Sequence, residues 1–228
     1  MRGHNVSLET LSDYHAPRRC FREPIAEILN AASLLSEAAD AHLAGNKARA
    51  DERIRAADMP AVRAWTDSLW GSAKRNPDLP HYIRYRAVPD APPSLPKAER
   101  IPERMPTAAQ RKLILGRYGR HCVFCGIPLI SPQVRDEFRR HYPEAAYWGS
   151  TNATCHAAFQ CMWLQFDHVL PHARGGDNSL ENIVPTCTGC NYGRASMTLE
   201  EVGLLDPRTR PPKQAEWDGL ERILRRPA

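Results

Sequence analysis

The sequence predicts a globular α+β protein with a helical N-terminal region and a C-terminal unit held together by zinc. Helical periodicity begins at Glu23, where apolar residues recur at three- and four-residue steps. Clustered aromatic and basic residues at 82–86 favour a short edge strand over a nucleic-acid contact, although both remain open. Two Cys-x-x-Cys pairs, which begin at Cys122 and Cys187, indicate a metal site.

The bulk composition is that of a soluble chain with one large domain or two small ones. Its 228 residues carry a net charge of +5, which fits either an ordinary basic surface or a polyanionic partner. No stretch approaches the roughly 18 apolar residues of a membrane span. The segment 1–15 lacks the apolar core of a secretion signal, so we expect a cytoplasmic protein. In that compartment seven cysteines favour metal binding or buried thiols over disulfides.

Three helices are expected in an N-terminal helical region, residues 1–75. The first follows Pro24, which suits a first helical turn, and stops before Gly45. The second is charged and Ala-rich. The third begins at Pro60 and ends before Gly71, with a stripe of apolar residues along one face. Nothing in this region indicates catalysis.

A change of composition divides the rest of the chain. Residues 76–106 are rich in proline and indicate a linker or extended segment. Thr107 then suits the cap of a helix that leads directly into the first Cys-x-x-Cys pair. We therefore expect a C-terminal domain over residues 107–228, with an insertion at 126–166 between the two pairs. The insertion contains a helical stretch at 131–149, and short helices are expected at 198–204 and 214–226.

The four paired cysteines have the spacing of a structural zinc site. A two-residue gap lets both thiolates of a pair face one ion, and zinc prefers four such ligands in a tetrahedron. The predicted zinc ligands are Cys122, Cys125, Cys187 and Cys190. A redox Cys-x-x-Cys is the alternative, but it explains one pair and leaves the other without a role.

Three further cysteines stand outside the pairs, and small buried hydrophobes are the simplest interpretation of them. They are Cys20, Cys155 and Cys161. His156 follows Cys155 directly, so a second metal site is the alternative, and His121 and His172 have similar weak claims as ligands.

The stretch "DHVLPHARGGDNSLENIVPTCTGCNYGR", preceded by "CVFC", resembles the HNH family of endonucleases. The shared positions are an Asp-His pair, Pro171, Gly175-Gly176, Asn182 and a Cys-x-x-Cys-Asn sequence. The resemblance covers residues 167–194, or 122–194 with the first Cys-x-x-Cys pair and the insertion. The first hundred residues lie outside it.

The resemblance implies a ββα-metal fold, in which two antiparallel strands and a helix surround one divalent ion. Mapped onto this chain, the first strand would cover residues 166–169 and the connecting loop residues 171–179. The second strand would cover 182–185, and the helix would start near Cys190. The two glycines would permit a tight turn in the loop.

The resemblance also implies a role for each of four residues. His168 would be the general base, since imidazole titrates near about 6.5 and can take a proton from water at neutral pH. Asp167 and Asn191 would hold one catalytic Mg²⁺ or Mn²⁺, because such hard ions prefer carboxylate and amide oxygens. Asn182 would tie the loop together and hold the histidine in position.

Arg174 and Arg194 are candidates for contacts with DNA phosphates, with a solvated surface role as the alternative for each. The implied activity is a metal-dependent endonuclease that acts on DNA, most simply double-stranded DNA. The second hypothesis is a non-catalytic, zinc-stapled DNA-binding module, and the third is a redox or zinc-storage protein. Sequence specificity, nicking or double-strand cutting, and a role such as phage defence stay open.

Overall fold

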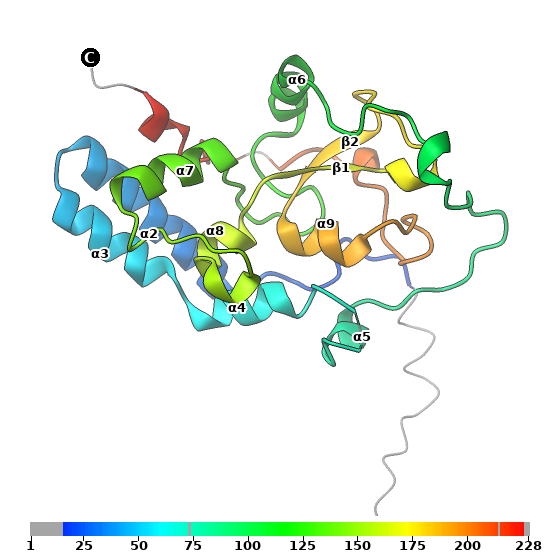
Figure 1. Ribbon diagram of the computed structural model, residues 1–228, viewed down its shortest axis with the longest axis horizontal. Helices are drawn as coiled ribbons and strands as arrows, with labels where there is room; N and C mark the ends of the chain where they lie inside the picture. The colour runs from blue at the N-terminus through cyan, green and yellow to red at the C-terminus, as the bar shows by residue number, and fades with distance from the viewer. Residues whose placement is uncertain (1–15, 73, 214, 226–228) are drawn as a thin grey trace, which may run out of the picture.

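The structure, a computed structural model, describes residues 16–72, 74–213 and 215–225. Helices of the N-terminal region and of the insertion form one group, and a pair of strands with two flanking helices forms the other (Figure 1). The expectation about a secretion signal at 1–15 lies outside the described residues. Within the described part, no helix is both long and apolar enough to cross a membrane.

The three expected N-terminal helices are confirmed. They are α2 (Ala26–Leu43), α3 (Lys47–Ala57) and α4 (Pro60–Asp67). Gly45 follows the end of α2 and has a φ of 76°. This left-handed conformation favours glycine, as expected for the residue that stops the helix. Asn46 then caps α3 by accepting a hydrogen bond from the backbone of Arg49 at 3.1 Å. Pro60 occupies the first turn of α4, as predicted.

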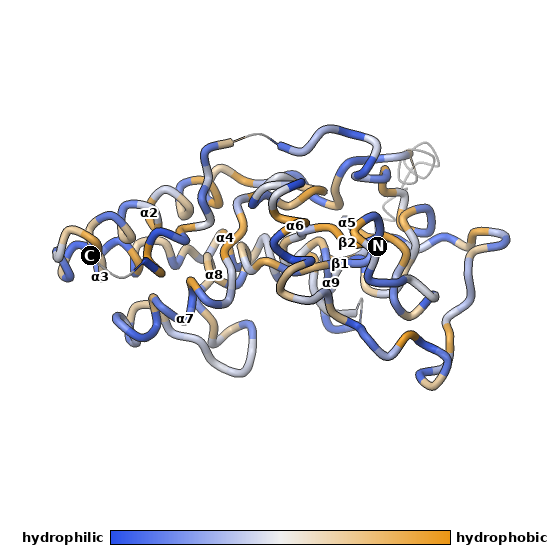
Figure 2. Tube along the Cα trace, turned by 90° about the horizontal axis from the view of Figure 1, so that it is seen from above, coloured by the Kyte–Doolittle hydropathy of each residue, from blue (hydrophilic) through white to orange (hydrophobic). Residues whose placement is uncertain are grey.

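The helices bury one apolar face each. Ile28 and Leu35 of α2 are fully buried, and α2 packs on α3 and on the helix α8 (Ala157–Cys161). Apolar and polar residues alternate along these helices at the corresponding spacing (Figure 2). Trp65 of α4 is fully buried, and its indole Nε1 donates to the carbonyl of Glu23 at 2.9 Å. The entry to α2 is thereby fixed to α4.

The segment 76–106 contains a short helix, α5 (Leu79–Tyr82), and a 3₁₀ turn at Lys97–Glu99. The predicted edge strand at 82–86 is wrong: no strand forms there, and Pro80 stands in the first turn of α5. Beyond α5 the chain runs as a long irregular segment around the strands and returns to α6 (Figure 1).

The C-terminal part begins with α6 (Ala108–Tyr118). Thr107 and Gln110 form a capping box at its start, which confirms the predicted cap. The insertion contains α7 (Pro132–His141) and α8, and α7 is shorter than the helical stretch of 131–149 suggests. Asp58, which follows α3, accepts a hydrogen bond from Ala157 N at 2.7 Å and so ties the insertion to the N-terminal helices.

Two short strands form an antiparallel pair, with Asp167 opposite Val184 and His168 opposite Ile183. They are β1 (Gln165–His168) and β2 (Ile183–Thr186), and the helix α9 (Thr188–Arg194) follows directly. Both strands lie within one residue of their expected positions. Helix α6 packs on β2, and α9 packs on β1 (Figure 1). The described chain is therefore mixed α and β, as predicted.

The remaining connections are short. Further 3₁₀ turns lie at Asn152–Thr154, His172–Arg174, Pro207–Thr209 and Glu221–Leu224. Short helices were expected at 198–204 and 214–226. Residues 198–204 form turns instead. In the second segment, only Glu221–Leu224 is helical among the described residues 215–225, and it forms a 3₁₀ turn.

One hydrophobic core crosses the two groups of elements. Gly189 of α9 faces α4: an added Cβ would lie 3.1 Å from the Leu69 side chain and 3.3 Å from that of Trp65. A glycine at this position therefore lets α9 approach α4 closely. The predicted division of the chain at residues 76 and 107 stays a prediction, but the packing of α9 depends on α4.

We predict that Trp65→Ala lowers the melting temperature by about 10 °C, because a buried Trp→Ala change costs about 3–5 kcal/mol in a chain of this size. Differential scanning fluorimetry of the zinc-loaded protein measures the shift. Leu113→Ala is the matched control, since that side chain on α6 is 58% exposed. Equal melting temperatures for Trp65→Ala and the control would contradict the proposed packing.

Candidate active site and metal cluster

The structure brings the four paired cysteines together. The first pair lies in the loop after α6. In the second pair, Cys187 is the N-cap of α9 and its sulfur accepts from the backbone N of Cys190. The ligand atoms of all four lie within 4.8 Å of one another, and three of the residues are buried. Four thiols at this separation can hold one metal ion, and an all-sulfur set is suited to zinc.

The paired thiols shift one another's pKa in opposite directions: the pKa of Cys122 lies well below its ordinary value, whereas burial and the neighbouring thiols raise the pKa of Cys125 and Cys190 well above it. Burial raises the pKa of the Cys122 thiol, but hydrogen bonds from the three neighbouring thiols outweigh it and hold that pKa well below its ordinary value. Burial raises the pKa of Cys20 to about 12 and also raises the pKa of Cys155 and Cys161. These three are buried and belong to no metal cluster found among the described residues.

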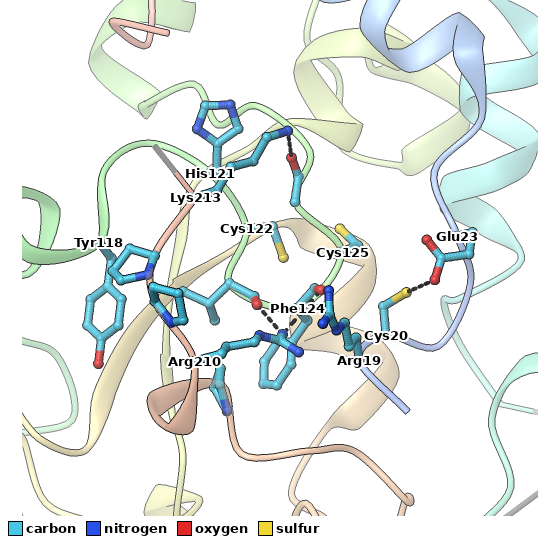
Figure 3. Close-up of a pocket in the computed structure, with 15 residues that line it drawn as sticks. Arg19, Cys20, Glu23, Tyr118, His121, Cys122, Phe124, Cys125, Arg210 and Lys213 are labelled. Atoms are coloured by element: carbon cyan, nitrogen blue, oxygen red, sulfur yellow. Dashed lines mark hydrogen bonds between the residues drawn. The ribbon is translucent and has the colours of Figure 1, made fainter. Parts of the chain in front are cut away.

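A cavity of about 430 Å³ opens beside the first cysteine pair and is lined by the side chains drawn in Figure 3. Arg19, Arg210 and Lys213 line it, and Arg210 and Lys213 donate to backbone carbonyls of the cysteine loop. Four thiolates around a divalent ion carry net negative charge. The three cations are therefore placed to offset the charge of the cluster, and we assign no ligand to the cavity.

The side chain of the candidate base, His168, is held by Asn178, a residue that was not predicted to belong to the site. Its Nε2 lies 3.0 Å from Oδ1 of Asn178, and the residue is 6% exposed. Burial lowers the pKa of His168 from its ordinary value, and the hydrogen bond to Asn178 opposes that shift. The imidazole is thus neutral at pH 7, the form that a general base requires.

Asn178 is held in turn by the proline-rich segment. We call residues 92–105 the strap, because they run along the loop 170–178 and contact it at several points. Asn178 Nδ2 donates to the carbonyls of Glu103 and Met105, at 2.6 and 3.4 Å. Two more contacts are the Leu95 N–H to the carbonyl of Ala173, at 2.8 Å, and His172 Nε2 to the carbonyl of Ile101, at 2.8 Å.

Asn182 ties the loop together but does not touch His168. Its Oδ1 accepts from Leu170 N at 2.8 Å, and its Nδ2 donates to the carbonyls of Leu170 and Asp177. The glycine at 176 makes this possible, since an added Cβ would lie 1.8 Å from the carbonyl oxygen of Leu170. The loop function expected of Asn182 matches this geometry, whereas the hold on the histidine belongs to Asn178.

Asp167 faces a guanidinium. Arg194 Nη2 lies 2.6 Å from Asp167 Oδ1, and Arg194 Nε lies 3.1 Å from Oδ2. Arg194 is 0% exposed and Asp167 is 6% exposed, so both charges lie away from solvent. This is a bidentate, buried ion pair between β1 and the last residue of α9.

The expected meeting of His168, Asp167 and Asn191 is not present in this structure. Asn191 Nδ2 lies 3.5 Å from Gln165 Oε1, so Asn191 shares the α9 face of β1 with Asp167. Neighbouring strand residues point to opposite faces, and His168 accordingly bonds to Asn178, which in turn bonds to the strap. Because Arg194 holds both oxygens of Asp167, these residues do not fit a divalent ion at Asp167 as they stand.

Neither arginine is placed for the expected phosphate contact. Arg194 is buried against Asp167, as described. Arg174 Nη2 pairs with Glu201 at 3.0 Å, with both side chains 11% exposed, and its other nitrogens donate to the carbonyls of Ser196 and Pro92. Both side chains hold the fold together, which corrects the expectation that they face solvent or DNA.

Comparison with known proteins agrees with the earlier resemblance. A family model described as HNH endonuclease matches residues 153–202. This segment belongs to the HNH endonuclease family. The match contains both strands, α9 and the second cysteine pair, while the first pair and the strap lie outside it. No curated protein and no solved structure matches the chain.

Within the HNH segment, sequence reasoning missed Asn178 and Glu201. Asn178 stands between two polar residues in a loop, and its local sequence carries no signal that distinguishes it from a turn former. Its partners in the strap are backbone carbonyls, which any residue type provides. Glu201 lay in a predicted helix, and its pairing with Arg174 follows only from the observed turns.

We predict that Cys187→Ser reduces the zinc content from one ion per chain to a small fraction, because the tetrahedral set loses a soft ligand. Inductively coupled plasma mass spectrometry on dialysed protein measures it. Cys161→Ser serves as the control, as a buried thiol outside the cluster. Full zinc in the Cys187 variant would mean that the ligands are assigned incorrectly.

Proposed function

We propose that the protein is an endonuclease that hydrolyses phosphodiester bonds of DNA, with His168 as the general base. Two findings support this. The segment 153–202 matches the HNH endonuclease family. The single observation that carries the mechanism is the hydrogen bond between His168 Nε2 and Asn178 Oδ1. Double-stranded DNA is the substrate that we propose to test first.

The hydrogen bonds of Asn178 select the tautomer of His168. Backbone carbonyls only accept, so the Asn178 atom that faces Glu103 and Met105 is the donating Nδ2. Its Oδ1 then faces the imidazole and accepts, so the proton of neutral His168 resides on Nε2. Nδ1 is left as the basic nitrogen. In the proposed reaction Nδ1 takes a proton from water, the water oxygen bonds to phosphorus, and the bond from phosphorus to the 3′ oxygen breaks. The leaving 3′ oxygen takes up a proton from solvent water, and His168 returns its proton to solvent.

We also propose that the four-cysteine cluster holds one structural Zn²⁺. The ion would join the loop after α6 to the start of α9. It would thereby fix both ends of the segment 126–186 that lies between the two cysteine pairs. Such sites contribute on the order of 10 kcal/mol of apparent binding energy, which becomes folding energy. The cluster would thereby set the position of α9 beneath β1.

HNH nucleases use divalent ions, and an ion at the substrate would offset negative charge on the phosphate. The expected Mg²⁺ or Mn²⁺ site at Asp167 and Asn191 does not fit the arrangement described above. We therefore assign to Asp167 no step in the reaction, and the dependence of cleavage on divalent ions is left to the assay below.

A zinc-stapled module that binds DNA without cutting it is the second candidate function. The burial of His168 favours it, since a substrate phosphate must reach Nδ1. Both candidates predict DNA binding, and only the first predicts nicking that depends on His168. The following experiment therefore separates them.

We predict that His168→Ala lowers the rate of plasmid nicking by about 10²–10⁴-fold, the usual contribution of a general base. The assay uses supercoiled plasmid with Mg²⁺ or Mn²⁺, with and without EDTA. His141→Ala, on the surface of α7, is the control. Equal nicking by wild type and His168→Ala would reject the proposed base, and DNA binding without any nicking would favour the binding module.

We predict that Asn178→Leu changes the pH dependence of nicking as well as its rate. The hydrogen bond from His168 to Asn178 is the largest contribution that opposes the effect of burial on the histidine pKa, so its loss lowers that pKa further. Because the neutral imidazole is the active form, the acid limb of the pH–rate profile should move to lower pH while the maximal rate falls. A profile that keeps its position would contradict this role for Asn178.

A further inference from the structure

We propose that Arg194 is the resident cation of Asp167, so that Asp167 joins β1 to α9 and is not a ligand of a divalent ion. The family frame places a metal ligand at this position, and the geometry of this chain points elsewhere. The inference concerns binding alone and holds whether or not the protein cuts DNA.

The hydrogen bonds of Arg194 account for its whole guanidinium. An arginine has five N–H donors in a fixed planar fork. Nε and one Nη2 donor bind the two oxygens of Asp167. The remaining three donors bind backbone carbonyls, which are those of Val169, His168 and Met197. Each of the five donors has a partner, so this side chain has none to offer to DNA.

The carboxylate is equally committed. Each oxygen of Asp167 accepts from Arg194, and the Asp167 side chain is 8% exposed beside a fully buried partner. A divalent ion at this carboxylate would either lie beside the buried guanidinium, with two cations sharing one carboxylate, or displace it and leave its charge buried and uncompensated. Such a state is strongly unfavourable. The guanidinium of Arg194, which competes with a metal ion for Asp167, is therefore part of the buried core and not an exposed side chain.

The same contacts give Arg194 a positioning role. It binds the carbonyls of His168 and Val169, which are consecutive residues at the end of β1. Together with the Asp167 pair, these contacts fix the backbone on both sides of the His168 Cα. Lysine has three donors on a flexible stem and no planar fork, so it cannot reproduce the set.

Mn²⁺ binding to the full-length, zinc-loaded protein without DNA tests the proposal, with free Mn²⁺ counted by electron paramagnetic resonance. The variants are Asp167→Asn, which removes the carboxylate charge of the expected ion site, and Asn191→Ala, which removes its amide oxygen. Asn191→Ala leaves the buried ion pair intact, which keeps the test informative if Asp167→Asn fails to fold. We expect wild type and both variants to bind Mn²⁺ alike. One Mn²⁺ per wild-type chain that either variant loses would overturn the proposal.

Melting temperature gives the second readout. Asp167→Asn strands a buried guanidinium and should lower the melting temperature by about 10 °C, and Arg194→Lys should not preserve it. Asp51→Asn, which breaks the exposed pair of Asp51 and Arg55 on α3, is the matched control with a smaller expected shift. The Mn²⁺ addition should leave the wild-type melting temperature unchanged. A rise that Asp167→Asn abolishes would also overturn the proposal, and neither readout depends on nuclease activity.

Discussion

The grouping of four thiols is the constraint on which the rest of the site depends. Cys122 and Cys125 follow α6, and Cys187 and Cys190 start α9, so the two ends of the segment 126–186 meet at one point. With α9 fixed there, its last residue reaches β1 and its Gly189 reaches α4. The short strands have little area of their own, and α6 and α9 on either side supply the packing that an isolated hairpin lacks.

One buried ion pair and one hydrogen-bonded histidine organise the chemistry around those strands. The pair of Asp167 and Arg194 is buried and fully hydrogen-bonded on the α9 face of β1. His168 lies on the other face, where its Nε2 bonds to Asn178 and the strap holds Asn178 in place. The sheet thus separates a charged, closed face from a neutral, histidine-bearing face. This separation explains why the same two neighbouring residues can differ so much in electrostatic environment.

Much of this could be predicted from the sequence, because some signals are local. Helix periodicity, the Thr107 cap and the paired cysteines predicted α2 to α4, α6 and the thiol group, and the family frame placed both strands within one residue. The partners of Arg194, Arg174 and Asn178 could not be predicted. They are backbone carbonyls or distant carboxylates whose identity depends on how loops pack, and the Pro-rich strap carries no periodic pattern. An arginine beside a nuclease motif suggests phosphate, and only its burial shows otherwise.

The strap has a consequence for how the chain is built. The amide that orients His168 is held by carbonyls of Glu103 and Met105, which precede α6 and lie outside the matched HNH segment. The segment 153–202 alone would keep the histidine and both strands, yet it would lose the carbonyls that hold Asn178 against His168. Cleavage of the backbone between 92 and 105 by a protease would have the same effect from a distance. The orientation of His168 therefore depends on an intact backbone in the proline-rich strap.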